Sequence, residues 1–235
     1  MQKLENVISG RSRGRSRPVV DAADLSLRLE QERLAALSRY DFLDGGSEDE
    51  FDHIARLAAH LFDAPIATVS LVGRDVQSFK GRYGLTIAGT PRNVSFCQTD
   101  ILTKREILVV EDASRDPRFA DNPMVTGEAH VRFYAGAPLV TPDNQVLGRV
   151  CVLDTKPRSC LSRREIMLLE DLATLAMDRL ERRREERRRT QTEDRHASFV
   201  RSSPNAVICV TGAGIISEWN NGARVMFGYA PDEAI

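Results

Sequence analysis

The spacing of hydrophobic positions predicts helices at the start of the chain. Between residues 25 and 37, Leu27, Leu34 and Leu37 recur at helical spacing with Arg and Glu between them. A second helical stripe runs over 51–61. Ser47 and Glu50 form a Ser-x-x-Glu capping box ahead of it, which is typical of a helix N-terminus. The sequence therefore predicts two helices before the first strand.

The pattern then changes to that of an antiparallel sheet. Residues 66–72 are apolar and rich in β-branched side chains, which predicts a buried strand, and the alternating stretch 76–84 predicts its hairpin partner. Further strands are predicted over 107–112, 131–140 and 146–154, and a short polar turn joins the last two. The expected fold class is α/β in the α+β sense, an antiparallel sheet flanked by helices.

The longest helical signal begins at Ser162, which forms a second capping box with Glu165. An apolar seam follows at three- and four-residue steps, and it predicts a coiled-coil-like helix that pairs with a second copy of the chain. The seam consists of Ile166, Leu169, Leu172, Ala176 and Leu180. Over 182–189 the helix becomes almost wholly charged, with Glu and Arg placed to form helical ion pairs.

The last part of the chain, residues 196–235, regains a globular composition. Its pattern predicts a strand, a Gly turn, a second strand and a short helix. About forty residues are too few to close a hydrophobic core without staples or partners. We therefore expect an incomplete domain here.

Composition narrows the possible functions. Hydrophobic residues make up 42% and charged residues 29%, and the net charge is −1, so nothing drives the chain toward nucleic acid or a membrane surface. No apolar run approaches the roughly 18–20 residues that span a bilayer. The basic stretch within residues 1–24 is expected to be a disordered tail rather than a secretory signal, because no apolar segment follows it.

The four cysteines are scattered and show no metal-ligand spacing. They predict reduced thiols, a cytoplasmic location and no metal site. The candidate functional residues are therefore single side chains rather than a set of disulfide-bonded or metal-binding cysteines.

Two parts of the chain resemble known families. Residues 33–157 resemble a GAF domain of the kind found in bacterial sensor kinases and diguanylate cyclases, and residues 198–233 resemble the first part of a PAS domain. The GAF resemblance rests on segments in family order: RLAALSRYDFLD, FDHIARLAAHLFDAPIATVSLV, QSFKGRYGL, TPRNVSFCQTDIL, LVVEDASRDPRFADNPMV, VRFYAGAPLV and LGRVCVLDTKPR. The PAS resemblance rests on SPNAV, a Gly turn, a WN pair and FGY-x-PDE.

The resemblance implies a modular signalling protein. Its expected parts are a sensory domain over 25–160, a signalling helix over 161–195 and an incomplete PAS-like domain over 196–235. It implies binding of a small effector, homodimerisation through the helix, and relay to a kinase or diguanylate cyclase output that this sequence does not contain. The chain itself is expected not to be an enzyme. The sequence identifies no cofactor.

Six residues are candidates for contact with the effector: Phe79, Ser95, Cys97, Asp112, Tyr134 and Cys151. Five of them have a simpler interpretation. Cys97 and Cys151 suit a buried core, Asp112 suits a turn held by Asx-type hydrogen bonds, and the two aromatic residues suit plain packing.

Two alternative functions remain open. Some GAF-type enzymes reduce free methionine sulfoxide, which needs an attacking thiol and a resolving thiol within reach. No cysteine closely follows Cys97, and the next is Cys151, which counts against this chemistry. The other alternative is a ligand-free dimerisation scaffold.

Overall fold

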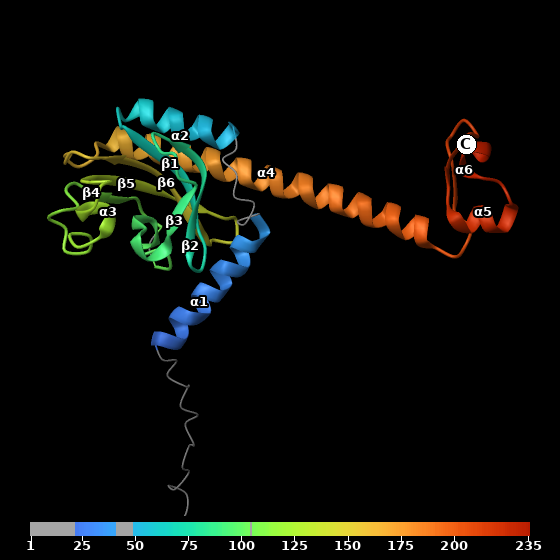
Figure 1. The fold of residues 1–235 in the computed structure, drawn as a ribbon, viewed down its shortest axis with the longest axis horizontal. Helices are drawn as coiled ribbons and strands as arrows, with labels where there is room; N and C mark the ends of the chain where they lie inside the picture. Colours follow the sequence, from blue (N-terminus) through green and yellow to red (C-terminus); the bar gives the residue numbers. More distant parts are fainter. Residues whose placement is uncertain (1–21, 41–48, 104) are drawn as a thin grey trace, which may run out of the picture.

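The structure, a computed structural model, describes residues 22–40, 49–103 and 105–235 (Figure 1). Its centre is a 6-stranded antiparallel sheet in the order β3-β2-β1-β6-β5-β4. The strands are β1 (Ile66–Val72), β2 (Val76–Tyr83), β3 (Gly89–Pro91), β4 (Leu108–Val110), β5 (Phe133–Val140) and β6 (Val146–Asp154). The predicted fold class is confirmed, although β4 is shorter than predicted and the edge strand β3 was not predicted.

Two helices cover one face of this sheet, α2 (Asp49–Leu61) and α4 (Arg163–Ser202). The chain also forms α1 (Ala22–Leu37) and α3 (Pro123–Thr126), with short 3-10 turns η1 (Ser38–Tyr40), η2 (Arg92–Val94) and η3 (Phe96–Gln98). Helix α2 packs on β1 and β2, and α4 packs on β5 and β6. The predicted basic tail, up to residue 21, and Ser47 of the first capping box lie outside the described residues.

The sheet separates two apolar cores because side chains alternate between its faces. In β5, Phe133 and Ala135 belong to the core shared with α2 and α4, whereas Tyr134 belongs to the core on the opposite face. In β6, Val150 and Val152 face the helices while Cys151 faces the other way. Loops, η3 and α3 cover that second face.

The N-terminus of α4 is as the sequence predicts. The Ser162 hydroxyl accepts a hydrogen bond from the Glu165 amide, and the Glu165 carboxylate accepts one from the Ser162 amide at 2.7 Å. This pair satisfies two of the backbone donors that a helix start leaves without partners.

The predicted dimer seam on α4 has a different role. Leu169, Leu172, Ala176 and Leu180 are buried in the protomer's own core against the sheet, and Ile166 is half-buried. The four buried side chains are therefore not free to form the intermolecular seam that their spacing predicts. A core-facing helix and a coiled-coil strand share nearly the same apolar period, so spacing alone does not distinguish them.

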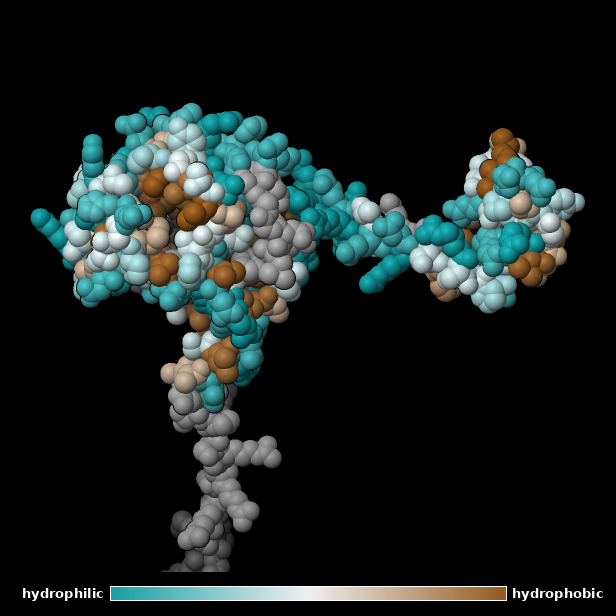
Figure 2. Space-filling model, viewed as in Figure 1, coloured by the Kyte–Doolittle hydropathy of each residue, from teal (hydrophilic) through white to brown (hydrophobic). Residues whose placement is uncertain are grey.

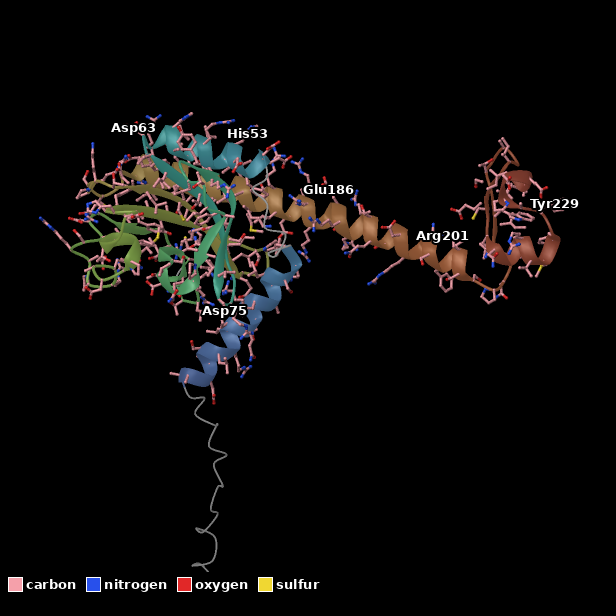
Figure 3. The ribbon with its side chains drawn as sticks, in the orientation of Figure 1. His53, Asp63, Asp75, Glu186, Arg201 and Tyr229 are labelled. Atoms are coloured by element: carbon pink, nitrogen blue, oxygen red, sulfur yellow. The ribbon has the colours of Figure 1, made fainter. Side chains whose placement is uncertain are left out.

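Beyond Leu180, α4 continues away from the sheet. Figure 3 shows Glu186 and Arg201 along this stretch, between the sheet and the C-terminal segment. Arg188 and Arg189 both pair with Glu185, as the charge pattern predicts. Exposed pairs of this kind stabilise a helix by only a few tenths of a kcal/mol each.

The C-terminal segment contains β7 (Ile208–Val210), β8 (Ile216–Trp219), α5 (Asn221–Phe227) and α6 (Pro231–Ala234). This is the predicted order of strand, turn, strand and helix. Apolar side chains are prominent on its surface (Figure 2), among them Val225 and Met226, which are 72% and 65% exposed. The segment itself buries little apolar surface. Its assignment to a PAS domain remains a prediction.

Candidate functional site

A small cavity lies on the sheet face opposite the helices. Five of the six predicted contact residues line it, namely Phe79, Ser95, Cys97, Tyr134 and Cys151. The space that water-sized spheres can occupy inside it is only about 40 Å³. A single buried water needs about 10–15 Å³ of such space, so the cavity accommodates a few waters rather than a large ligand.

The segment around η3 places Cys97 in the wall of the cavity. The Ser95 hydroxyl caps η3 by accepting a hydrogen bond from the Cys97 amide at 3.1 Å. The neighbouring Phe96 ring stacks on Phe119 at 4.3 Å and on Tyr134 at 5.1 Å between ring centroids. The cap and the aromatic stack together fix the orientation of this turn over the sheet.

Cys97 lies at the centre of a buried polar cluster. Its Sγ atom is 3.3 Å from Cys151 Sγ, 3.3 Å from the Tyr134 hydroxyl and 3.3 Å from the Ser70 hydroxyl. The Gln77 side-chain amide donates a hydrogen bond to the same sulfur at 3.1 Å. Cys151 Sγ is also 3.2 Å from the Tyr134 hydroxyl. Four polar side chains thus surround one sulfur atom.

This environment favours a negative charge on Cys97. Burial by itself raises the pKa of the Cys97 thiol, but the hydrogen bonds of the cluster, with the positive charge of Arg149, outweigh burial and lower that pKa. Burial raises the pKa of Cys151 and of the Tyr134 hydroxyl well above their usual values, and the sulfur of Cys97 adds to both shifts. Of these three groups, Cys97 is the one whose surroundings lower its pKa, whereas the surroundings of Cys151 and Tyr134 favour their protonated forms.

Arg149 supplies a buried positive charge next to this cluster. Its guanidinium donates to the carbonyl oxygens of Thr99, Glu106 and Gly136, and its side chain is almost fully buried. Its Nε atom has no hydrogen-bond partner among the described residues. Burying a positive charge is costly unless a negative charge compensates it, and a thiolate at Cys97 provides one.

Two sequence-based interpretations need correction. The expectation that no second thiol lies near Cys97 is wrong, because the fold brings Cys151, which is 54 residues away in the chain, to within 3.3 Å. Asp112 does not line the cavity. Its carboxylate accepts hydrogen bonds from the Ser114 amide and hydroxyl and pairs with Arg115, which is the turn role that the sequence also allowed.

Sequence reasoning missed Ser70, Gln77 and Arg149. Each is a polar residue inside a predicted strand, and each is almost fully buried. A polar side chain within a strand whose neighbours are apolar is a signal that could have found Ser70 and Arg149. Nothing in the sequence indicated that these residues meet at one sulfur atom.

Two other kinds of feature are absent from the described residues. No group of three or more His, Cys, Asp or Glu side chains there could hold a metal ion. No helix among them is long and apolar enough to cross a membrane.

Comparison with known proteins identifies the family of the domain that contains the cavity. Residues 47–180 match the model of the GAF domain. The chain is 42% identical over 151 residues to a cyclic di-GMP phosphodiesterase of Pseudomonas aeruginosa; the match covers 64% of this chain but only 26% of that protein.

Solved structures with a similar fold have lower sequence identity. The GAF domain of an Acinetobacter phosphoenolpyruvate-protein phosphotransferase is 16% identical with a TM-score of 0.49, covering 68% of this chain and 94% of that one. The free methionine-R-sulfoxide reductase of Neisseria meningitidis is 16% identical with a TM-score of 0.46, covering 68% and 91%. On the family match, which spans more than half of its residues, the chain belongs to the GAF domain family.

Proposed function

We propose that this chain is a sensory module in which a very small molecule acts at the Cys97 cavity and the resulting change passes to α4. The observation that carries the proposal is that five residues predicted for effector contact line a single cavity. A buried cavity whose walls combine apolar and convergent polar groups is the usual form of a small-molecule site. The free thiols among the described cysteines fit a reducing, cytoplasmic compartment.

The two faces of the sheet provide the route of relay. Tyr134 and Cys151 reach the cavity, while the residues beside them in β5 and β6 pack against α4. A shift of either strand therefore changes both the cavity and the helix docking surface. An effector alters α4 only through a difference in its affinity for two such arrangements.

The output is proposed from the curated relative. Because that protein is a cyclic di-GMP phosphodiesterase, we propose that this module regulates an enzyme of cyclic di-GMP metabolism rather than a kinase. The PAS-like segment would be a second module on the path, and homodimerisation would use surfaces other than the buried seam of α4. The chain spans about a quarter of that relative.

Occluding the cavity tests the sensory role. Leu85 lines the cavity from a loop, so Leu85→Trp should fill it without disturbing the sheet. Ile87 lies two residues away, is 46% exposed and does not line the cavity, so Ile87→Trp is the matched control. The measurement is the intact native mass of full chain purified from cells without reductant.

We expect a mass shift, from a bound molecule or a covalent change at the cavity thiols, in the wild type and in Ile87→Trp, and none in Leu85→Trp. If each of the three proteins had the mass calculated from its own sequence, sensing at this cavity would be contradicted and the ligand-free scaffold would be favoured.

A second candidate function is reduction of free methionine sulfoxide. The observation that favours it is the Cys97–Cys151 approach of 3.3 Å, since the reaction needs a resolving thiol. The small size of the cavity counts against it, because the amino acid would have to enter space for a few waters. Thiol-dependent turnover of free methionine sulfoxide that disappears in Cys97→Ser would establish it.

A further inference from the structure

Cys97 and Cys151 lie in a geometry that would permit a covalent bond between their sulfur atoms. Their sulfur atoms are 3.3 Å apart, and a disulfide bond requires about 2.05 Å, so a movement of little more than 1 Å joins them. Both side chains are almost fully buried, and both line the same cavity. A reagent that reaches one sulfur within this cavity therefore has the other next to it.

The surrounding groups give the two sulfurs different roles. The Gln77 side-chain amide donates a hydrogen bond to Cys97 Sγ, the Ser70 and Tyr134 hydroxyls each lie 3.3 Å from it, and Arg149 adds a positive charge nearby. These contacts stabilise a thiolate, which is the reactive form of cysteine. Cys151 has fewer such partners and stays a thiol, so Cys97 is the attacking sulfur and Cys151 the resolving one.

The size of the cavity restricts the reagent. Its 40 Å³ of water-accessible space admits a molecule no larger than a few waters. Hydrogen peroxide has two oxygen atoms and meets this limit, whereas an organic hydroperoxide with a bulky substituent does not. The same limit should exclude larger electrophiles from Cys97.

We propose that hydrogen peroxide oxidises Cys97 and Cys151 to a reversible disulfide inside the cavity. The Cys97 thiolate attacks one peroxide oxygen, the O–O bond breaks, and the departing hydroxide takes up a proton to leave as water. Cys97 is then a sulfenic acid. The Cys151 sulfur attacks the Cys97 sulfur, the S–O bond breaks, and the hydroxide leaves as a second water with the Cys151 proton. Two thiols lose two electrons to one peroxide, and a reducing thiol pool reverses the change.

This chemistry identifies hydrogen peroxide as the signal in the proposed function. It rests on the proposed function only for the effect of oxidation on α4. Closing the sulfur–sulfur gap draws Cys151 toward η3, and Val150 and Val152 on either side of Cys151 lie in the core that contacts α4. Formation of the disulfide depends on thiol chemistry alone, so it can be tested separately from the relay to α4.

Thiol mapping of the full chain tests the proposal. Reduced protein is treated with hydrogen peroxide, denatured, alkylated and digested without reductant. We expect a Cys97–Cys151 linked peptide, while Cys160, which is exposed, and Cys209 form no disulfide and oxidise more slowly. The link should be lost in Cys97→Ser and retained in the control Cys160→Ser.

Trapping and reagent size complete the test. Wild-type protein unfolded in denaturant that contains dimedone, early in the peroxide reaction, should carry the label on Cys97 as a sulfenic acid, and Cys151→Ser treated in the same way should accumulate that label; the wild-type arm does not depend on the folding of a variant. Cumene hydroperoxide should oxidise Cys97 more slowly than hydrogen peroxide does, relative to Cys160 in the same sample. Recovery of Cys97 and Cys151 as free thiols while Cys160 oxidises would overturn the proposal, and so would equal reaction with both peroxides.

Discussion

Gly148→Ala should unfold or severely destabilise the sensory domain. Gly148 lies in β6 opposite Leu71 of β1, and a Cβ atom built on it would come within 1.8 Å of the Ser70 carbonyl oxygen. The obstacle is backbone in the middle of a sheet, so it cannot move aside without breaking the β1–β6 pairing. We expect a loss of about 3 kcal/mol or more, the upper end for overpacking, out of a total stability of about 5–15 kcal/mol.

The measurement for Gly148→Ala is urea denaturation followed by circular dichroism. Gly212→Ala is the control, because a Cβ atom there would meet nothing within 4 Å. If Gly148→Ala unfolded at the same urea concentration as the wild type, the close approach of β1 and β6 described here would be wrong.

Leu169→Ala should cost about 3 kcal/mol of stability. Leu169 is fully buried where α4 packs on the sheet, and Leu-to-Ala changes in such positions typically cost about 2–5 kcal/mol because a cavity remains. The substitution removes no contact with a second chain if the seam faces the protomer's own core. The free energy of unfolding should therefore fall independently of protein concentration.

Met167→Ala is the matched control for Leu169→Ala, since Met167 lies two residues away on the same helix and is 55% exposed. Its effect should stay within about 0.5 kcal/mol. A loss at Leu169 that shrank on dilution would instead indicate that the seam holds two chains together, as its spacing alone predicts, because dilution also removes the partner chain from the wild type.

The order of elements was predictable because local chemistry determines it. The β-branched run of β1, the alternation of β2 and the capping box at Ser162 each specify an element without reference to the rest of the chain. The short β3 and α3 were not predictable, because three or four residues carry too little periodicity to stand out.

The candidate site was predictable only in part. The resemblance to a GAF domain indicated five of the residues that line the cavity, including both cysteines. The contact between Cys97 and Cys151 depends on how a turn between β3 and β4 folds back over β6, which is a long-range property that no local pattern encodes. Whether the α4 seam packs on the domain's own sheet or on another helix likewise depends on tertiary structure, not on the local sequence pattern.

Amide hydrogen exchange of α4 tests the central claim, that the state of the Cys97 cavity is coupled to this helix. Reduced and hydrogen-peroxide-treated full chain are compared after mass spectrometry has shown the Cys97–Cys151 disulfide to be complete, with peroxide-treated Cys97→Ser as the control. We predict that exchange of α4 amides differs between the two wild-type states by about fivefold or more, the lower end of typical allosteric coupling, and does not change in Cys97→Ser. Identical exchange along α4 in fully reduced and fully disulfide-bonded protein would contradict the relay.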